Sequence, residues 1–287
     1  FLGFWAGFEA AARMGVRAVP GGGMSSEDRL GLLERCGANV LCCTPTYAIR
    51  LAEVGEAMGK SVADLGVKTI VVCGEPGGSI PAVRERIEAA WQAKVVDHHG
   101  MTEIGPVTVS DEENADWLRV LHFSYHAEVI DPETLAPVEL GEVGELVLTT
   151  LGRFGAPLLR YRTGDLVKPV AVPGGDPAAF VLEGGIIGRS DDMVVVRGVN
   201  IYPSAVDAVV RGCEGIGEYQ VEVDQRAALP ELLIRVEGGE AEAKGLERAL
   251  RQASSTRSTA ARSRMFASIM RMLLSGHCAG ASTDWGS

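Results

Sequence analysis

The chain has 287 residues, and 27 basic against 38 acidic side chains give it a formal net charge of −11. At the usual ~100 to 200 residues per domain, this length predicts two domains. The acidic balance argues against a nucleic-acid groove or a surface that binds anionic membranes, because either would need a basic face. Hydrophobic residues make up 46% of the chain, yet no apolar run approaches the ~20 residues that cross a bilayer, so no transmembrane segment is expected. The opening Phe1 to Trp5 lacks a basic stretch and is soon interrupted by Glu9, so a signal peptide is not expected either.

Helix-like and strand-like segments alternate along roughly the first hundred residues. Ser25 and Ser26 precede the acidic first turn of one helix, and Thr44-Pro45 opens another. The other expected elements are the strands Asn39 to Cys43, Thr69 to Cys73 and Lys94 to Asp97, and the amphipathic helix Pro81 to Ala93. Apolar strands that alternate with helices predict an α/β fold with a parallel sheet whose two faces are both covered by helices.

The pattern changes near residue 105 to short alternating strands, for example Ala127 to Asp131 and Gly144 to Thr150, which predict an antiparallel β subdomain. Beyond Gly188 the pattern predicts a small α/β domain. Its expected elements are a strand at 193–197, a turn at Gly198, a helix from Pro203, strands near 219–223 and 231–237, and a helix to about 252.

We therefore expect a large domain over residues 1–188, which is α/β to about 104 and β-rich over 105–188, and a small domain over 189–253. The domain boundary is placed at 188–192. The tail 254–287 is rich in Ser, Thr, Arg, Ala and Met, contains no Lys or Glu, and does not resemble the rest of the chain.

The six cysteines form no CxxC pair and have no regular spacing. Cys42, Cys43 and Cys73 lie in apolar, strand-like runs. Buried, reduced thiols in a cytoplasmic protein are therefore favoured over disulfides or a zinc site.

The histidines could suggest a metal site, since two are adjacent and two others could share one face of a strand. These are His98 and His99, and His122 and His126. No cysteine accompanies them and their spacing is not typical of zinc ligands, so satisfied or solvent-facing imidazoles are favoured over zinc.

Two glycine-rich loops directly follow predicted strands: Gly74-Glu75-Pro76-Gly77-Gly78-Ser79, and His98-His99-Gly100-Met101-Thr102-Glu103-Ile104-Gly105. In an open α/β sheet, ligands bind at the carboxyl ends of the strands. Glycine allows a ligand to approach the backbone closely, and each loop carries an acid for which a tight turn has no structural need. Either loop alone would favour an ordinary turn, but two on consecutive strands favour a ligand site.

Two further segments contain polar clusters: Arg160-Tyr161-Arg162-Thr163-Gly164-Asp165-Leu166, and Gly188-Arg189-Ser190-Asp191-Asp192-Met193 followed by Arg197-Gly198-Val199-Asn200. Separately, these could be a common turn and a solvated charge cluster. With the two loops, and with Thr44-Pro45-Thr46-Tyr47-Ala48, they form an ordered set of motifs that resembles the adenylate-forming ligase superfamily, and within it the phenylacetate-coenzyme A ligase family. The last of these motifs continues through Ile201-Tyr202-Pro203, and the resemblance as a whole covers roughly residues 1–237.

The resemblance implies an enzyme that converts a carboxylic acid and ATP to an acyl-adenylate and pyrophosphate, and then transfers the acyl group to the thiol of coenzyme A. It implies that Glu103 holds Mg²⁺, a hard cation that prefers oxygen ligands, and that Thr102 contacts the α-phosphate. His99 stands where many relatives have a tyrosine that stacks on adenine, with Gly100 beside it. Asp97 would accept from the adenine amino group.

By the same resemblance, the segment from Gly74 through Glu75 to Pro76 forms the other wall of the adenine slot. Asp165 would bind both ribose hydroxyls, because a carboxylate has paired acceptors that match a vicinal diol. Arg189 would place a cation near the ribose and phosphate. Asp191 matches the hinge about which the small domain swings, and Gly198 would approach the thioester-forming tunnel.

Two parts of the family pattern are absent from the sequence: a Ser/Thr/Gly-rich phosphate loop upstream, and a catalytic lysine near the end of the small domain. The last lysine is Lys244, too early for that role. A chain that starts at Phe1 and ends in an unusual tail suggests a fragment with a frameshift or a truncated gene model. We therefore expect this chain alone to be inactive or nearly so.

Three alternatives remain open at this stage. The chain could be an adenylyltransferase that stops at the adenylate or AMP ester, a non-catalytic nucleotide-binding remnant or, with least support, a structural module. The acyl substrate cannot be deduced from a chain with 6% aromatic residues, so an aryl acid is implied only by the resemblance, as is a homodimer.

Overall fold

The computed structural model describes residues 2–172, 179–190, 194–196, 199–201, 203–213, 215–216, 218–224, 231–255 and 270–274. The chain forms two compact units, Phe1–Ile187 and Gly188–Ser287. Among the described residues, no helix has both the length and the apolar character that crossing a bilayer would require.

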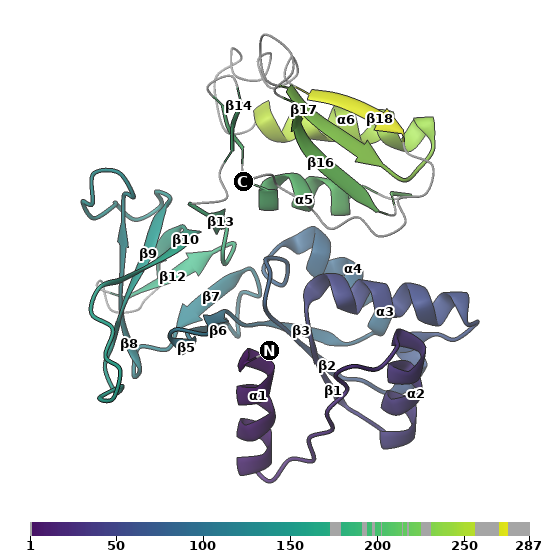
Figure 1. Cartoon of the computed structure of the whole chain (residues 1–287), viewed down its shortest axis with the longest axis horizontal. Coiled ribbons are helices and arrows are strands. Elements are labelled where there is room, and N and C mark those ends of the chain that lie inside the picture. Colours follow the sequence, from purple (N-terminus) through teal and green to yellow (C-terminus); the bar gives the residue numbers. More distant parts are fainter. Residues whose placement is uncertain are drawn as a thin grey trace. The chain divides into compact units, whose positions relative to one another are not determined.

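A three-stranded parallel sheet in the order β1-β2-β3 lies in the amino-terminal half of the first unit (Figure 1). Its strands are β1 (Val40–Cys43), β2 (Thr69–Val72) and β3 (Lys94–Asp97). The helices of this region are α1 (Leu2–Arg13), α2 (Ser26–Cys36), α3 (Pro45–Ala57), the 3₁₀ helix η1 (Val62–Leu65) and α4 (Pro81–Trp91). The prediction of a parallel sheet with flanking helices is confirmed.

Local sequence signals explain where two of these helices begin. The Ser25 side chain accepts a hydrogen bond from Asp28 N (3.1 Å) at the start of α2, and Thr44 Oγ1 accepts one from Tyr47 N (3.3 Å) at the start of α3. Each side chain satisfies a backbone N–H that has no partner within its own helix. The fully buried Trp91 joins α4 to α3, because its indole N–H donates to Ala48 O at 2.9 Å.

Helices cover one face of the parallel sheet in the described part of the chain. Leu41, Ile70 and Val95 are buried in a core with α2, α3 and α4. On the opposite face Val40 is 49% exposed, and Cys42 is also exposed. The prediction that both faces are covered is therefore wrong for these residues. Val71 and Val96, on the same face as Cys42, are partly buried, so the exposure lies at β1. Apolar residues occupy both faces, and the sequence pattern therefore gave no signal for this exposure.

The cysteines of this sheet differ in burial. Cys43 is buried, Cys73 is partly buried and Cys42 is exposed, so the prediction of buried thiols holds fully only for Cys43. Burial is the main reason why the pKa of the Cys43 thiol rises to about 12, which disfavours the reactive thiolate at neutral pH.

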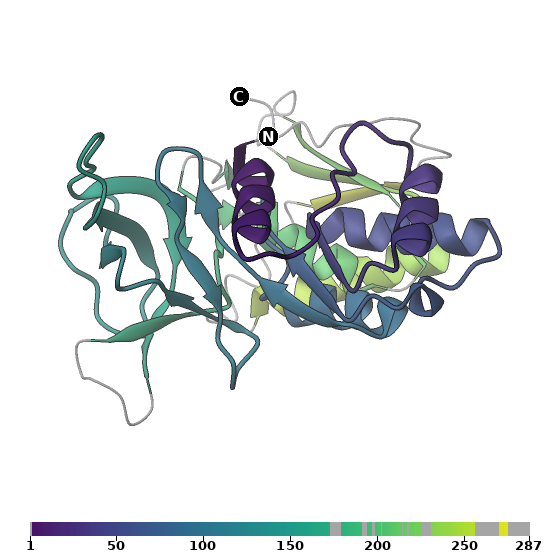
Figure 2. The ribbon, with the colours of Figure 1, turned by 90° about the horizontal axis from the view of Figure 1, so that it is seen from below.

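Helix α1 does not pack like the other helices of the first unit. It lies apart from α2, at the other end of a long connection, in both views (Figure 1, Figure 2). Its Trp5 side chain is 61% exposed and stacks on Phe8, with ring centroids 5.9 Å apart. The sequence reasoning did not predict this helix.

The second half of the unit is antiparallel, as predicted. In one sheet β9 (Gly144–Thr150) pairs with β8 (Tyr125–Ile130) and β10 (Tyr161–Val167). A second sheet has the order β11-β12-β7-β6. Its strands are β11 (Pro169–Ala171), β12 (Phe180–Glu183), β7 (Trp117–Val120) and β6 (Thr108–Ser110), and a small hairpin contains β4 (Gly100–Met101) and β5 (Gly105–Pro106).

A buried acid follows β6. The Asp111 carboxylate accepts hydrogen bonds from the Arg119 side chain and from the backbone N–H groups of Glu113 and Asn114. Burial alone would raise the pKa of Asp111, but these hydrogen bonds outweigh burial and hold the pKa below its ordinary value.

The second unit is a small α/β structure. Its elements are β13 (Gly188–Arg189), β14 (Val194–Val196), β15 (Val199–Ile201), α5 (Pro203–Arg211), β16 (Tyr219–Asp224), β17 (Glu231–Val236), α6 (Glu240–Ser255) and β18 (Met270–Leu274). The last strand comes from the tail and pairs in parallel with β17, with Leu232 opposite Met270. The composition of the tail did not predict this strand. The expected turn at Gly198 lies outside the described residues.

Candidate functional site

The loop after β3 is held in place by hydrogen bonds to its backbone groups. His99 N donates to Thr108 Oγ1 (3.2 Å), and His99 O accepts from the N–H groups of Val107 (2.9 Å) and Thr108 (3.1 Å). The buried Tyr125 hydroxyl donates to Ile104 O at 3.1 Å. These bonds fix the loop on both sides of Thr102 and Glu103, which are both exposed.

The loop after β2 is packed against the start of α3. Glu75 Oε1 accepts from Thr46 N at 2.8 Å, so this acid satisfies a backbone donor at the helix amino terminus. A Cβ atom on Gly77 would lie 2.7 Å from Pro45 Cβ. The expectation that the turn has no structural need for Glu75 is therefore wrong, and Gly77 serves a close contact within the protein.

Asp97, at the end of β3, ties the same loop to the sheet. It is 7% exposed, its Oδ2 accepts from Ser79 Oγ (2.6 Å), and its Oδ1 accepts from His98 N (2.9 Å). Burial is the largest influence and raises the pKa of Asp97, and the hydrogen bonds from Ser79 and His98 oppose it. A Cβ on Gly78 would lie 2.5 Å from Asp97 Cγ, so glycine is required here. The resemblance implies that Asp97 accepts a hydrogen bond from the adenine amino group. In the structure its carboxylate accepts hydrogen bonds from Ser79 and His98.

Asp165 lies at an irregularity in β10. The pairing register with β9 shifts between Arg162 and Leu166, a feature that re-aims side chains at functional sites. Gly164, inside the shift, has φ of 77°, which favours glycine. Asp165 N donates to Thr163 Oγ1 at 3.0 Å, and its side chain is buried.

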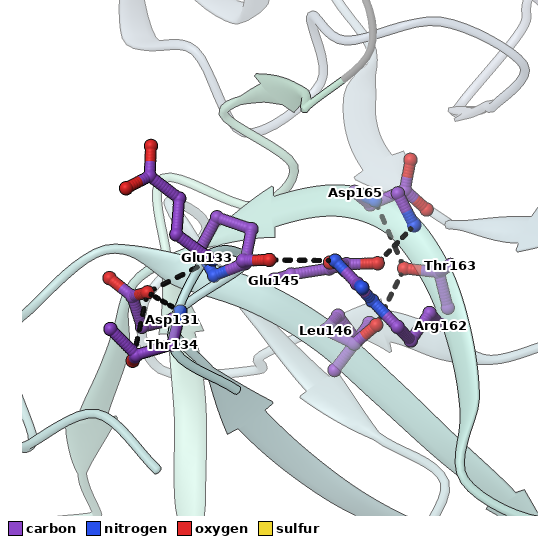
Figure 3. A network of polar contacts seen from close by, with 10 residues as sticks. Asp131, Glu133, Thr134, Glu145, Leu146, Arg162, Thr163 and Asp165 are labelled. Atoms are coloured by element: carbon purple, nitrogen blue, oxygen red, sulfur yellow. Dashed lines mark hydrogen bonds and ion pairs between the residues drawn. The ribbon is translucent and has the colours of Figure 1, made fainter. Parts of the chain in front are cut away.

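A buried carboxylate supports this bulge from the neighbouring strand. Glu145 is 2% exposed, accepts from Gly164 N at 3.1 Å and forms an ion pair with Arg162. Arg162 also donates to Pro132 O at 3.1 Å. Figure 3 shows this network beside Asp165, so the local backbone that presents Asp165 is set by side chains that sequence reasoning did not select. Glu145, an acid within the otherwise apolar strand β9, was the sequence signal that could have indicated this network.

The structure brings two of the predicted motifs into direct contact. His99 Nε2 lies 2.9 Å from Asp165 Oδ2, although the residues are 66 positions apart. The two side chains are 13% and 8% exposed, respectively. The loop after β3 and the bulge of β10 therefore meet at one place.

The remaining predicted residues lie in the loop after β3 or in the second unit. Arg153 donates to the carbonyl oxygen of Glu103, and in the described part of the chain no ion pair or hydrogen bond joins the Glu103 carboxylate to Asp165. Arg189 is exposed and belongs to the second unit. Asp191 and Gly198 lie outside the described residues.

Family models match both units of the chain. The model of the AMP-binding enzyme matches residues 2–154, and that of the AMP-binding enzyme C-terminal domain matches residues 198–269. The chain belongs to the AMP-binding enzyme family. This agrees with the resemblance that the motifs indicated.

Curated relatives agree with the family models. The chain is 35% identical to a phenylacetate-coenzyme A ligase of Thermus thermophilus over 242 residues, which are 83% of this chain and 53% of the relative. It is 31% identical to the enzyme of the same description from Escherichia coli, over 83% of this chain and 54% of the relative. The chain thus spans about half the length of these relatives.

Solved structures support the fold. One is a 2-hydroxyisobutyryl-CoA ligase in the postadenylation state, in complex with 2-HIB-AMP. It superimposes with a TM-score of 0.82 at 32% identity, and the match covers 100% of this chain and 62% of the ligase chain. An anthranilate CoA ligase in complex with anthranoyl-AMP has a TM-score of 0.60 at 18% identity, which supports the fold alone.

Proposed function

We propose that this chain supplies the nucleotide-binding part of an ATP-dependent acid–coenzyme A ligase. In that reaction a carboxylate oxygen attacks the α-phosphorus of ATP and pyrophosphate leaves. The thiolate of coenzyme A then attacks the acyl carbon and AMP leaves. The relatives described as phenylacetate-coenzyme A ligases, and the ligase structure with a bound acyl-AMP, support this class of reaction and favour an aryl or other small acid.

One observation carries the proposal: the 2.9 Å contact between His99 and Asp165, which joins two glycine-containing motifs that are far apart in the sequence. The carboxylate of Asp165 suits the 2′- and 3′-hydroxyls of a ribose, because it offers two acceptor oxygens. Asp97 lies at the end of β3, and the segment Gly74 to Pro76 is hydrogen-bonded to the start of α3 through Glu75. Both would border the adenine.

The Glu103 carboxylate fits a Mg²⁺ ion. It is exposed, and within the described residues it forms no ion pair that would neutralise it. Mg²⁺ in nucleotide-binding enzymes is commonly held by one or two carboxylates together with phosphate oxygens. When bound, the ion would neutralise charge on the phosphates of ATP. Thr102, the neighbour of Glu103 in the exposed loop, would contact the α-phosphate.

We assign the remaining roles to the second unit, on the basis of its match to the C-terminal domain model. Residues 1–188 would form the large AMP-binding domain and 189–253 the small domain. Arg189 would place a cation near ribose and phosphate, Asp191 would serve as the hinge, and Gly198 would approach coenzyme A. These assignments need the domain movement that such hinges allow.

Nucleotide binding is the first test. Titration calorimetry with AMP should detect binding by the wild-type chain, and Asp165→Asn should weaken it by roughly 10-fold or more, since hydrogen bonds to charged groups contribute ~1.5 to 3 kcal/mol. Asp64→Asn removes an exposed carboxylate elsewhere and is the matched control. Equal affinity for AMP in wild type and Asp165→Asn would refute the assignment of Asp165.

Catalysis is the second test. The sequence contains neither the phosphate loop nor the lysine of the family pattern, and one preorganised donor is typically worth ~2.7 to 4 kcal/mol, or roughly a hundred- to a thousandfold in rate. We therefore propose that the chain alone releases almost no pyrophosphate from ATP with phenylacetate. Rapid pyrophosphate release would contradict this, and coenzyme A consumption would then distinguish a ligase from an adenylyltransferase.

A further inference from the structure

Within the described part of the chain, the imidazole of His99 makes one hydrogen bond, and its partner is Asp165. Its other ring nitrogen, Nδ1, is buried and has no hydrogen-bond partner. A buried polar atom without a partner destabilises a structure, whereas an apolar ring would fill the same space without that cost. The contact with Asp165 is therefore what an imidazole provides at this position and a phenyl ring would not.

The contact also defines which nitrogen carries the proton. An ionised carboxylate only accepts hydrogen bonds, so His99 Nε2 must be protonated to donate to Asp165 Oδ2. When the ring is neutral, the buried Nδ1 carries no proton and can only accept. This assignment of the tautomer follows from the hydrogen-bond partners.

Both ends of the contact are fixed by the backbone. The N–H and C=O groups of His99 are bonded to the segment Val107 to Thr108, which sets the direction of the ring. Asp165 N is bonded to Thr163 Oγ1, whose own hydroxyl donates to Leu146 O at 2.8 Å. A donor and an acceptor held in this way restrict the rotation of the carboxylate.

We propose that His99 is a positioning residue for Asp165: its Nε2–H holds the carboxylate so that it meets the 2′- and 3′-hydroxyls of ribose in one orientation. The proposal rests on the proposed function, in which Asp165 binds the sugar. It differs from the adenine-stacking role that the resemblance implies for this position, because stacking needs only a flat ring and positioning needs an N–H donor.

Two variants separate the ring from the donor. His99→Phe keeps a flat ring and removes the N–H, whereas His99→Gln keeps an N–H donor of similar reach and removes the ring. Each is compared with wild type by calorimetry with AMP and with 2′-deoxy-AMP. Circular dichroism melting curves establish that each variant is folded.

The preference for AMP over 2′-deoxy-AMP is the diagnostic quantity. We expect ~10- to 100-fold in wild type, as for one hydrogen bond to a charged group, about threefold or less in His99→Phe, and a preference near wild type in His99→Gln. If His99 only stacked on adenine, His99→Phe would leave both affinities near wild type, and His99→Gln would weaken both nucleotides equally, so that neither variant would change the preference. An unchanged preference in His99→Phe, or its loss in His99→Gln, would overturn the proposal.

The outcomes distinguish this proposal from the proposed function. If wild type binds both nucleotides equally or binds neither, the role of Asp165 in sugar binding fails, and the positioning role fails with it. If wild type discriminates and His99→Phe discriminates equally, only the positioning role fails. Independently of any nucleotide, ¹⁵N NMR should show a proton on His99 Nε2, and an Nε2 that carries no proton would overturn the proposal.

Discussion

The contact between Gly78 and Asp97 yields the sharpest stability prediction. A Cβ on residue 78 would lie 2.5 Å from Asp97 Cγ, 2.6 Å from Asp97 Cβ and 2.6 Å from Val72 Cγ2. Asp97 is 7% exposed and Val72 is fully buried, so neither side chain can move into solvent. Gly78→Ala must therefore displace the loop and weaken the hydrogen bond between Ser79 and Asp97.

The expected magnitude follows from these contacts. Overpacking usually costs ~1 to 3 kcal/mol, and three contacts with buried atoms place this variant near the upper end. In a unit of the size of Phe1–Ile187, about 3 kcal/mol corresponds to a fall in Tm of roughly 6 to 12 °C, at ~2 to 4 °C per kcal/mol. Differential scanning calorimetry measures the shift.

The matched control is Gly22→Ala, where an added Cβ would meet nothing within 4 Å. A surface change of this kind is usually within ~0.5 kcal/mol of wild type, so its Tm should shift by no more than about 2 °C. If Gly78→Ala melts as close to wild type as Gly22→Ala does, then the loop is not packed against Asp97 and the reasoning is wrong.

Three further predictions concern a buried acid, the exposed acid of the site and the core. The pKa of Asp111 is held below its ordinary value of 3.8, so ionised Asp111 stabilises the fold above that pH. The loss of unfolding free energy caused by Asp111→Asn, measured by urea titration, should therefore shrink as the pH falls from about 5 to about 2. Glu103→Gln should bring the ratio of ATP affinities with and without Mg²⁺ toward one in calorimetry, and a ratio equal to that of wild type would exclude Glu103 as a ligand. Trp91→Phe removes the indole N–H that donates to Ala48 O and should lower the free energy of unfolding by ~1 to 3 kcal/mol; no change would show that this bond is not formed.

Elements with strong local signals were predicted closely from the sequence. The strands Lys94–Asp97 and Gly144–Thr150 have the bounds expected from their apolar runs. The helix that starts after Thr44 was marked by its capping hydroxyl and by the proline that follows. In each case the information lies within a few neighbouring residues, which is where capping and strand patterns act.

Burial and packing partners were harder to predict. Val40 and Cys42 are as apolar as their buried neighbours, so only the structure shows that these two residues of β1 are exposed. The helix Leu2–Arg13 lacks an acidic first turn and was missed. The strand Met270–Leu274 was missed because it lies in a tail of unusual composition.

The site was predicted in part. The motifs indicated that the loop with His99 and the strand with Asp165 share a site, and the structure places these two side chains in contact. The sequence could not show that His99 donates to Asp165, because the contact depends on the register shift in β10. Nor could it show that Glu75 bonds to Thr46 N, since that bond depends on how closely the loop approaches α3.

A crystal structure of the chain with AMP tests the nucleotide site most directly. We predict that both ribose hydroxyls lie within hydrogen-bond distance of the Asp165 carboxylate, that His99 Nε2 still contacts this carboxylate, and that the phosphate lies on the side of Thr102 and Glu103. AMP bound elsewhere, or a ribose that does not touch Asp165, would contradict the assignment.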